Sequence, residues 1–282
     1  MRIFFLHLVQ FLIFPLICFF LSFFIKTDID KKREMLNALK VDRNLIIMGD
    51  SKAVVDFNYY LLKDCFPNYN IINISIWPKN PQFNYSVYQD ILKKKKMSNS
   101  IIIYNSTFRH TLNRVNKEWE PWDTKAKIDA LLGESYKFKH IENKNGFVNI
   151  TTQNFRDIKV VESFYKSLEN QNDKNFIHQI NYLRLIQELF EKGDNNLFLI
   201  CELPFDSTVE QLHLNSQYYS SYKKSMTANF ETKFIYFGYI PILNKSTYWF
   251  DRDHLKNSGT IVFTPLFCDS LQSKITNLQS GK

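Results

Sequence analysis

The 282-residue chain contains little glycine and proline, seven and eight residues respectively, and it has no low-complexity tract or internal repeat. This composition excludes a collagen-like, fibrous or disordered chain. Apolar residues make up 45% of the sequence, with 26 Phe and 15 Tyr, so the chain can bury one sizeable core. The length is that of one large domain with insertions.

Several common ligand-binding patterns are also absent. The sequence has no GxGxxG, no Walker-type phosphate loop and no HExxH zinc helix. Its four cysteines, Cys18, Cys65, Cys201 and Cys268, show neither zinc-ligand spacing nor a CxxC pair. Cys18 lies in an N-terminal apolar run, and the other three allow at most one disulfide among them, so they do not define the redox compartment. The sequence implies neither a metal nor an organic cofactor.

Charge of one sign is not concentrated in this chain. The net charge of +8 would suit an anionic partner such as a charged envelope polymer, a lipid surface or nucleic acid. Lysines and carboxylates nevertheless alternate along nearly the whole sequence. The only basic run, residues 93–96, falls at the expected end of a helix, where cations suit the helix dipole. We therefore favour solvated charged faces and expect no nucleic-acid partner.

A long apolar run stands at the N-terminus. Residues 3–25 are almost entirely Phe, Leu and Ile, which matches the roughly 20 residues that cross a bilayer as a helix. A cleavable signal has a shorter apolar region and small residues at its cleavage site, and neither is seen. We therefore expect an uncleaved transmembrane signal anchor over residues 1–26, followed by a juxtamembrane linker helix within residues 27–43.

The charges around this run give a conflicting orientation signal. Only Arg2 precedes it, whereas four cations follow within residues 26–33, so the positive-inside rule would keep the main domain in the cytoplasm. Three carboxylates interleave with those cations at residues 28–34, and long domains translocate largely regardless of charge. The functional argument below favours the opposite, extracytoplasmic side, and a cytoplasm-facing domain remains the alternative.

Strand and helix patterns alternate after the linker. Apolar runs typical of buried strands occur at residues 44–48, 71–76, 100–104, 197–201 and 233–237. Helical patterns occur at residues 53–62, 83–92, 176–190, 218–230 and 254–271. This alternation predicts a parallel sheet covered by helices on both faces, in an α/β domain over residues 44–275. Residues 107–170 break the rhythm, and so long a stretch predicts an inserted cap.

Two short motifs supply a set of catalytic side chains. Gly49-Asp50-Ser51 directly follows the first expected strand and opens the first expected helix. Near the other end, Asp251 and His254 precede the last helix at Asp-x-x-His spacing. A nucleophilic serine needs a base, and the base needs an orienting carboxylate. Because sites in open parallel sheets form at the carboxyl ends of the strands, we predict Ser51 as nucleophile, His254 as base and Asp251 as orienting acid.

Each half of this pattern also has a structural explanation. Asp and Ser are preferred at helix starts, so Asp50 and Ser51 are equally compatible with an ordinary N-cap. A histidine before a helix is commonly structural, and Asp253 competes with Asp251 for the place beside His254 or caps the last helix. The pattern becomes specific only when both halves occur at the first and last strands of one sheet.

On these motifs the sequence resembles the SGNH (GDSL-like) hydrolase family. More closely, it is similar to membrane-anchored members that act in O-acylation of cell-envelope polysaccharides. The resemblance rests on Gly49-Asp50-Ser51 and on Asp251-x-x-His254 with the following Leu255, and it covers roughly residues 44–271 without the cap. It implies a flavodoxin-like three-layer sandwich with a five-stranded parallel sheet, and the roles given above for Ser51, His254 and Asp251.

The resemblance also implies an oxyanion hole with three donors. In the family these are the N–H of the serine, a glycine N–H after the second strand and an asparagine side chain after the third. Ser51 keeps the first donor, and Asn105 follows the third strand here. No glycine follows the second strand, so the N–H of Lys79 or the side chain of Asn80 would have to substitute. Arg109 lies near the same edge and either binds an anionic substrate or is a plain surface residue.

From this resemblance we expect a single-pass, membrane-anchored serine esterase or O-acyltransferase on the periplasmic or cell-surface side. Ser51 would take an acyl group, expected to be acetyl, and pass it to a glycan hydroxyl or to water. The expected partners are the membrane, a cell-envelope polysaccharide substrate and a polytopic membrane acyltransferase that supplies the acyl group. The alternative is a catalytically inactive, anchored binding or assembly protein, which the missing glycine motivates.

Overall fold

The computed structural model describes residues 27–76, 80–108, 144–148, 150–151 and 174–280, together with the single positions 13 and 163. The expected anchor and most of the expected cap lie outside the described residues. Within the described part, no helix is both long and apolar enough to cross a membrane. The chain divides into two compact units, residues 1–31 with 116–139 and residues 32–115 with 140–282.

The described end of the first unit leads into helix α2 (Asp28–Asn37), which continues into the second unit. Thr27 and Asp30 cap the start of this helix reciprocally. Asp30 Oδ2 accepts hydrogen bonds from the backbone N–H and the hydroxyl of Thr27 at 2.9 and 2.7 Å, and Thr27 Oγ1 accepts the N–H of Asp30 at 3.2 Å. Such a capping box satisfies donors that a helix start leaves unpaired.

The second unit is built on a five-stranded sheet with the order β2-β1-β3-β4-β5. Its strands are β1 (Asn44–Met48), β2 (Asn70–Asn73), β3 (Ile101–Asn105), β4 (Leu197–Glu202) and β5 (Phe234–Tyr236). All four pairings are parallel, and the order is that of flavodoxin-like doubly wound sheets. Every residue of β1 and β3 is buried, as expected for strands covered on both faces. The predicted five-stranded parallel sheet is confirmed.

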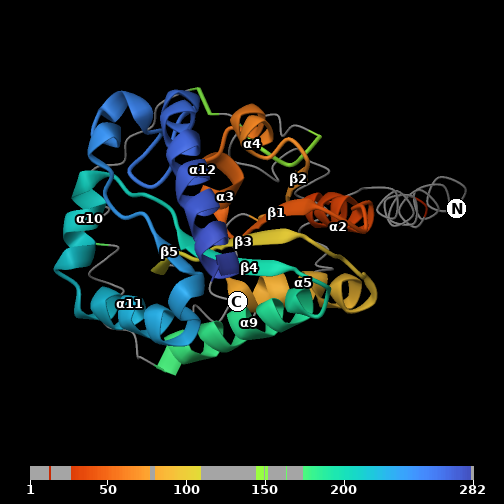
Figure 1. Ribbon diagram of the computed structural model, residues 1–282. Coiled ribbons are helices and arrows are strands. Elements are labelled where there is room, and N and C mark those ends of the chain that lie inside the picture. Colours follow the sequence, from red (N-terminus) through yellow and green to blue (C-terminus); the bar gives the residue numbers. More distant parts are fainter. Residues whose placement is uncertain are drawn as a thin grey trace, which may run out of the picture. The chain divides into compact units, whose positions relative to one another are not determined.

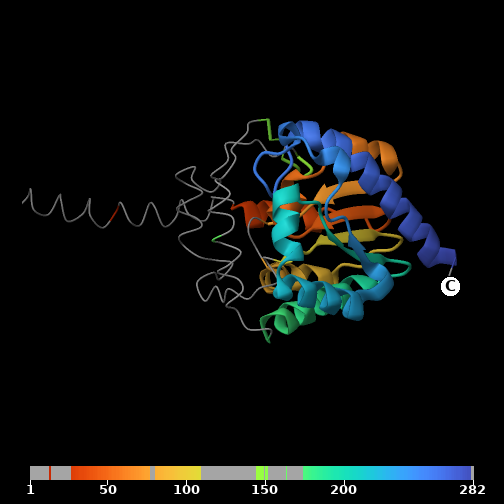
Figure 2. The ribbon, with the colours of Figure 1, turned by 90° about the vertical axis from the view of Figure 1, so that its left-hand side faces the viewer.

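Helices cover both faces of this sheet (Figures 1 and 2). One face carries α3 (Ser51–Val55), α4 (Tyr59–Cys65) and α12 (Asn257–Ser280), and the other carries α5 (Pro81–Lys94), α9 (Lys174–Glu191) and α11 (Gln217–Phe230). Between β4 and α11 lies α10 (Ser207–Leu214), and three 3-10 turns follow α11: η1 (Glu231–Lys233), η2 (Pro241–Leu243) and η3 (Ser246–Tyr248). The described elements therefore form three layers.

The structure corrects two helix assignments made from the sequence. The expected helix at residues 53–62 is divided into α3 and α4, because the Asn58 side chain caps a new helix by accepting the N–H groups of Tyr60 and Leu61 at 3.0 and 3.3 Å. The last helix begins at Asn257 rather than at residue 254, which leaves His254 in the preceding loop.

Part of the expected cap belongs to the edge of the main body. The carbonyl of Asn145 accepts the N–H of Asn73, which ends β2, at 2.8 Å. Val148 N–H donates to Val54 of α3 at 3.2 Å, and the carbonyl of Ile150 accepts the N–H of Asn257 at 2.7 Å. Asn145, Val148 and Ile150 thereby connect β2, α3 and the start of α12, three segments that surround the site described below.

A disulfide joins α4 to α12. Cys65 and Cys268 are 203 residues apart in sequence, with their Cα atoms 6.2 Å apart. Beside this bond the ring of Phe57 packs against those of Phe263 and Phe267, with centroids 5.9 and 4.7 Å away. Cys201, a free thiol in the described part of the chain, is buried in β4. The disulfide thus fastens the helix after the serine segment to the helix after the histidine segment.

We expect the Cys65→Ala variant to have a free energy of unfolding about 2–5 kcal/mol lower than the parent, because the bond restricts a long loop in the unfolded chain. Urea denaturation with and without a thiol reductant measures this loss. Cys201→Ala serves as the control, since it should keep the reductant-dependent shift of the urea midpoint. A parent protein whose midpoint does not respond to reductant would contradict the disulfide.

Candidate active site

The segment after β1 turns sharply and presents Ser51 at the carboxyl edge of the sheet. Gly49 has a φ of 138°, and a Cβ at this position would lie 2.4 Å from the carbonyl oxygen of Asn105. Only glycine tolerates both conditions. Asp50 is the N-cap of α3, with its Oδ1 accepting the N–H of Lys52 at 3.0 Å. Because Asp50 performs the capping, the Ser51 hydroxyl is left to contact His254.

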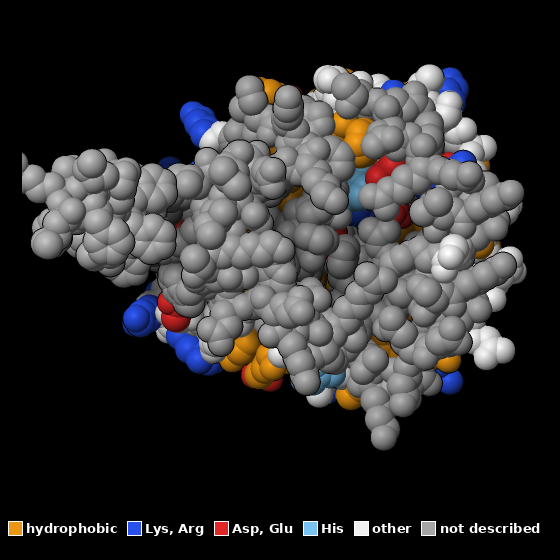
Figure 3. Space-filling model, turned by 180° about the vertical axis from the view of Figure 1, so that it is seen from behind, with side chains coloured by type: hydrophobic (Ala, Val, Ile, Leu, Met, Phe, Trp, Pro, Cys, Tyr) orange, Lys and Arg blue, Asp and Glu red, His pale blue; other side chains and the backbone are white. Residues whose placement is uncertain are grey.

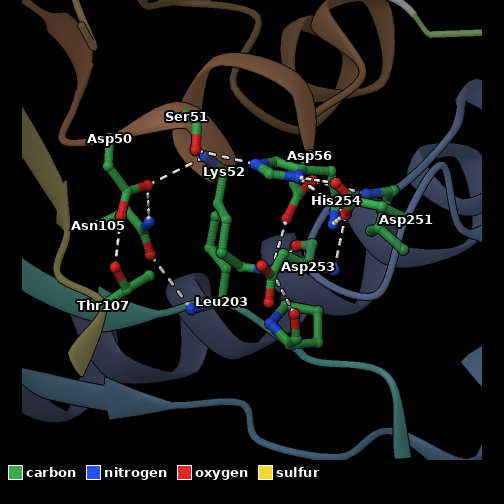
Figure 4. A network of polar contacts seen from close by, with 12 residues as sticks. Asp50, Ser51, Lys52, Asp56, Asn105, Thr107, Leu203, Asp251, Asp253 and His254 are labelled. Atoms are coloured by element: carbon green, nitrogen blue, oxygen red, sulfur yellow. Dashed lines mark hydrogen bonds and ion pairs between the residues drawn. The ribbon is translucent and has the colours of Figure 1, made fainter. Parts of the chain in front are cut away.

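The structure brings the three predicted residues together (Figure 4). The Oγ of Ser51 lies 2.8 Å from Nε2 of His254, while Nδ1 of His254 lies 2.9 and 3.0 Å from the two carboxylate oxygens of Asp251. Ser51, His254 and Asp251 retain 1%, 2% and 4% of their surface exposed. Asp251, rather than Asp253, therefore occupies the place beside the imidazole.

A tight turn presents the Asp251 carboxylate to the histidine. Its Oδ1 accepts the backbone N–H groups of Asp253 and His254, both at 2.8 Å. Phe250 N–H donates to the carbonyl of His254 at 2.8 Å, which closes the same turn from the other side. The Asp-x-x-His segment thus forms a tight turn. The imidazole ring is oriented by the Asp251 carboxylate, which two backbone N–H groups hold in place.

Burial and neighbouring charge act against each other on this pair. Burial lowers the pKa of His254, but the charge and hydrogen bond of Asp251, together with the charges of Asp56 and Asp253, outweigh it and raise that pKa above its ordinary value. Burial opposes ionisation of Asp251, yet the charge and hydrogen bond of His254 and the two backbone N–H groups hold the pKa of this carboxyl well below its usual range. Asp251 is therefore a carboxylate that stabilises the imidazolium form of His254.

This arrangement can remove a proton from the serine. In the neutral histidine, Nδ1–H donates to Asp251, and Nε2 accepts the hydroxyl proton of Ser51. Proton transfer to Nε2 would generate a nucleophilic oxygen on Ser51 and an imidazolium next to Asp251. The geometry is that of a Ser-His-Asp set, which suits transfer of an acyl group through a serine ester.

A second polar network lies next to the serine. Asn105, at the end of β3, donates from Nδ2 to Oδ1 of Asp50 at 2.7 Å, and its Oδ1 accepts the N–H of Leu203 at 3.2 Å. Thr107 Oγ1 donates to the other Asp50 oxygen at 2.6 Å (Figure 4). One of the two amide hydrogens of Asn105 is thus used by Asp50, and its second hydrogen is the one that an oxyanion would require.

The remaining predicted site residues are less informative. Asn80 is the N-cap of α5, because its Oδ1 accepts the N–H of Phe83 at 2.9 Å. Lys79 and Arg109 lie outside the described residues, so their assigned roles stay predictions. Among the described side chains, no group of three or more His, Cys, Asp or Glu residues is arranged to hold a metal ion.

The sequence analysis missed a buried ion pair beside the serine. Lys52 Nζ lies 3.2 Å from Oδ2 of Asp56, and both side chains are shielded from solvent. Lysine and aspartate four residues apart are typical of an exposed helix face, so the pattern gave no sign of burial. Figure 3 shows the molecule from behind, where histidine, acidic and basic side chains are visible close together.

No family model and no curated protein matches this sequence. Among solved structures, one similar chain is described as "a putative platelet activating factor from Streptococcus pneumonia". It shares 12% sequence identity with this protein at a TM-score of 0.45, with 89% of this chain and 90% of that chain covered. A likeness of this size does not assign a family, so the functional argument below relies on the site itself.

We expect Asp251→Asn to lower the pKa of His254. Without the carboxylate, the imidazolium loses its largest stabilising partner, and burial, which favours the neutral imidazole, meets less opposition. An NMR titration of the imidazole Cε1–H signals, assigned with a His254→Gln variant, measures the change. Asp269→Asn, which removes an exposed carboxylate of α12, is the matched control and should leave the pKa of His254 unchanged. An unchanged pKa in Asp251→Asn would contradict the pairing.

Proposed function

We propose that this protein is a serine esterase or O-acyltransferase of the SGNH type, acting through an acyl-serine intermediate on Ser51. The observation that carries the proposal is the continuous hydrogen-bonded line from Ser51 Oγ through His254 to Asp251, at 2.8 and 2.9 Å. These side chains come from opposite ends of the sequence and meet at the carboxyl edge of the sheet. A purely structural N-cap serine and a purely structural histidine would not require this alignment.

The reaction follows from the geometry. Nε2 of His254 takes the hydroxyl proton as Ser51 Oγ attacks the acyl carbonyl, and a tetrahedral oxyanion forms. Its collapse breaks the ester bond, and the leaving alcohol takes the proton from His254. A glycan hydroxyl or water then attacks the acyl-serine, with His254 again removing and returning one proton. The Ser51 N–H and the second amide hydrogen of Asn105 are the proposed oxyanion donors, and loss of one such donor costs on the order of 100-fold in rate.

We further propose that the enzyme is anchored by residues 1–26 and faces away from the cytoplasm. The apolar run at residues 3–25 supports the anchor. The Cys65–Cys268 disulfide supports the orientation, because such bonds persist in oxidising compartments and are rare in the cytosol. On that side of the membrane, the proposed acceptor is a cell-envelope polysaccharide and the proposed acyl source is a polytopic acyltransferase in the same membrane.

One observation favours the alternative of a binding or assembly protein. Ser51 is only 1% exposed, so a substrate reaches it only if neighbouring groups make way. In this alternative the fold and the three side chains are retained, but the serine never forms an ester. The two functions differ in covalent reactivity, and that difference is measurable on the purified protein.

We expect a fluorophosphonate probe to label the full-length protein and the Ser51→Ala variant to lose both labelling and hydrolysis of p-nitrophenyl acetate. Hydrolysis should fall by at least about 10³-fold, because both the nucleophile and its activation are removed. Ser258→Ala, which changes an exposed serine at the start of α12, is the control and should label like the parent. Labelling that persists without Ser51 would overturn the assignment, and an unlabelled parent would favour the binding protein.

The proposed orientation predicts that added protease will digest a C-terminal tag on this chain in cells whose cytoplasmic membrane is intact. Where the cells have an outer membrane or wall, that layer is first made permeable to the protease. The main domain would lie outside the cytoplasmic membrane and therefore be accessible. A tagged cytoplasmic protein in the same cells provides the protected control. Digestion that occurs only after the cytoplasmic membrane is lysed would place the domain in the cytoplasm and reverse the proposed topology.

A further inference from the structure

Lys52, the residue after the candidate nucleophile, has its ammonium group in the protein interior. The residue is 2% exposed, and Nζ lies 4.5 Å from the ring centroid of Phe205. Nζ donates to the carbonyl of Pro204 at 2.6 Å and to the carbonyl of Asp253, and it lies 3.2 Å from Oδ2 of Asp56 (Figure 4). A buried ammonium is costly unless its donors find partners, and here three oxygens surround it.

The partners of this ion pair lie on the two sides of the candidate base. The Asp253 carbonyl, bound by Lys52, belongs to the residue before His254. On the other side, the N–H of Leu255 donates to Oδ1 of Asp56 at 2.8 Å. Asp56 is fully buried and directly follows α3, the helix that begins with Ser51. Both backbone neighbours of His254 are therefore tied to the segment that carries the serine.

The contacts of Lys52 and Asp56 link the histidine turn to α3, which the hydrogen bonds within the turn around Asp251 do not. The hydrogen bonds from Asp251 to the N–H groups of Asp253 and His254 fix the shape of the turn and the direction of the ring. They contain no link to α3. Lys52 and Asp56 provide that link, and they place the turn at the distance from α3 that the Ser51–His254 hydrogen bond needs. Small errors at such a distance are expensive in rate.

We propose that Lys52 and Asp56 are positioning residues that dock both sides of His254 onto the nucleophile helix. The inference rests on the proposed esterase or acyltransferase function for its kinetic readout. Lys52 also donates a hydrogen bond to the carbonyl of Pro204, which follows β4. The nucleophile segment, the histidine turn and the end of β4 therefore meet at one ammonium group. The pair acts through His254 and does not itself touch the reacting atoms.

Asp56 also has an electrostatic effect on the base. In the part of the chain that the structure describes, the charged groups around His254 include Asp251 and Asp253 of its own turn, and Lys52 and Asp56 from the nucleophile segment. Ionised Asp56 contributes to raising the pKa of His254. Burial raises the pKa of Asp56 itself, and the charge of Lys52 opposes that rise. Removing that charge while keeping an oxygen for the Leu255 N–H should lower the pKa of His254, since Lys52 and burial then act with less opposition.

The Asp56→Asn variant tests this effect through the pH dependence of kcat/KM for p-nitrophenyl acetate hydrolysis. The base must be neutral, so the rate rises as pH increases through the pKa of His254. A lower pKa moves the acidic limb of the profile to lower pH, and we expect a displacement of about half a pH unit or more. A profile that superposes on that of the parent would overturn the electrostatic part of the proposal.

Lys52→Met tests the docking, because it keeps the apolar stem and removes every donor. We expect kcat to fall about 10- to 100-fold with a much smaller change in KM, since the fault lies in the alignment of Ser51 and His254. The matched control is Lys32→Met. Lys32 is equally buried, and its Nζ donates to the carbonyls of Asn73 at 2.8 Å and Gly146 at 3.1 Å.

Both lysine variants should lose stability, but only Lys52→Met should lose activity per folded molecule, with folded fraction taken from circular dichroism. Equal specific activity in the two variants would overturn the docking role. If Lys52→Met does not fold, Asp56→Ala takes its place, because it removes the acceptor of the Leu255 N–H and should give the same loss of kcat. If the parent shows no turnover, the proposed function fails, whereas an NMR titration still tests whether Asp56→Asn lowers the pKa of His254.

Discussion

The arrangement of this protein depends on one hydrogen bond between side chains 203 residues apart, from the Ser51 hydroxyl to Nε2 of His254. A parallel sheet makes such a contact possible, because every strand delivers its following segment to the same edge. The serine follows β1 near the middle of the sheet, and the histidine turn reaches that edge just before α12. The strand order therefore determines which distant residues lie close to one another.

The ionisable groups at this edge are almost fully buried. Asp50, Asp56 and Asp251 all lie within the protein interior, close to Lys52 and His254. Such a site is stable only if each charge has an opposite charge or several hydrogen-bond partners. Asp50 has three donors, Asp251 has an imidazole and two amides, and Asp56 has a lysine and one amide. The low dielectric around these pairs strengthens their interactions and fixes their geometry.

The amount predictable from the sequence differed between the sheet, the helices and the site. Strands β1 and β3 were found because both of their faces are buried, which leaves uninterrupted apolar runs such as Leu-Ile-Ile in β1. The break between α3 and α4 was missed because the capping role of Asn58 depends on its side-chain geometry rather than on hydrophobic spacing. Helix α10 was missed as well, since its eight residues contain only three apolar side chains, too few to establish a helical period.

Within the site, chemistry made the serine, histidine and aspartate predictable, because general-base activation restricts the residue types and the Asp-x-x-His spacing suits a tight turn. Lys52 and Asp56 were not predictable, since the same pair on an exposed helix would have an identical spacing. The pairing of Cys65 with Cys268 was equally hidden, because three candidate cysteines allow several partners until the packing of α4 on α12 selects one.

The position of the disulfide in the sequence has a consequence for biosynthesis. A ribosome completes β1, α3 and α4 long before it reaches the histidine turn and Cys268. The nascent domain therefore holds a serine without its base and a thiol without its partner. Truncated products that end before α12 lack the base-side half of the aromatic cluster around Phe57, so they cannot close the same core. The contact between Ser51 and His254 therefore forms late in synthesis, when the final helix docks.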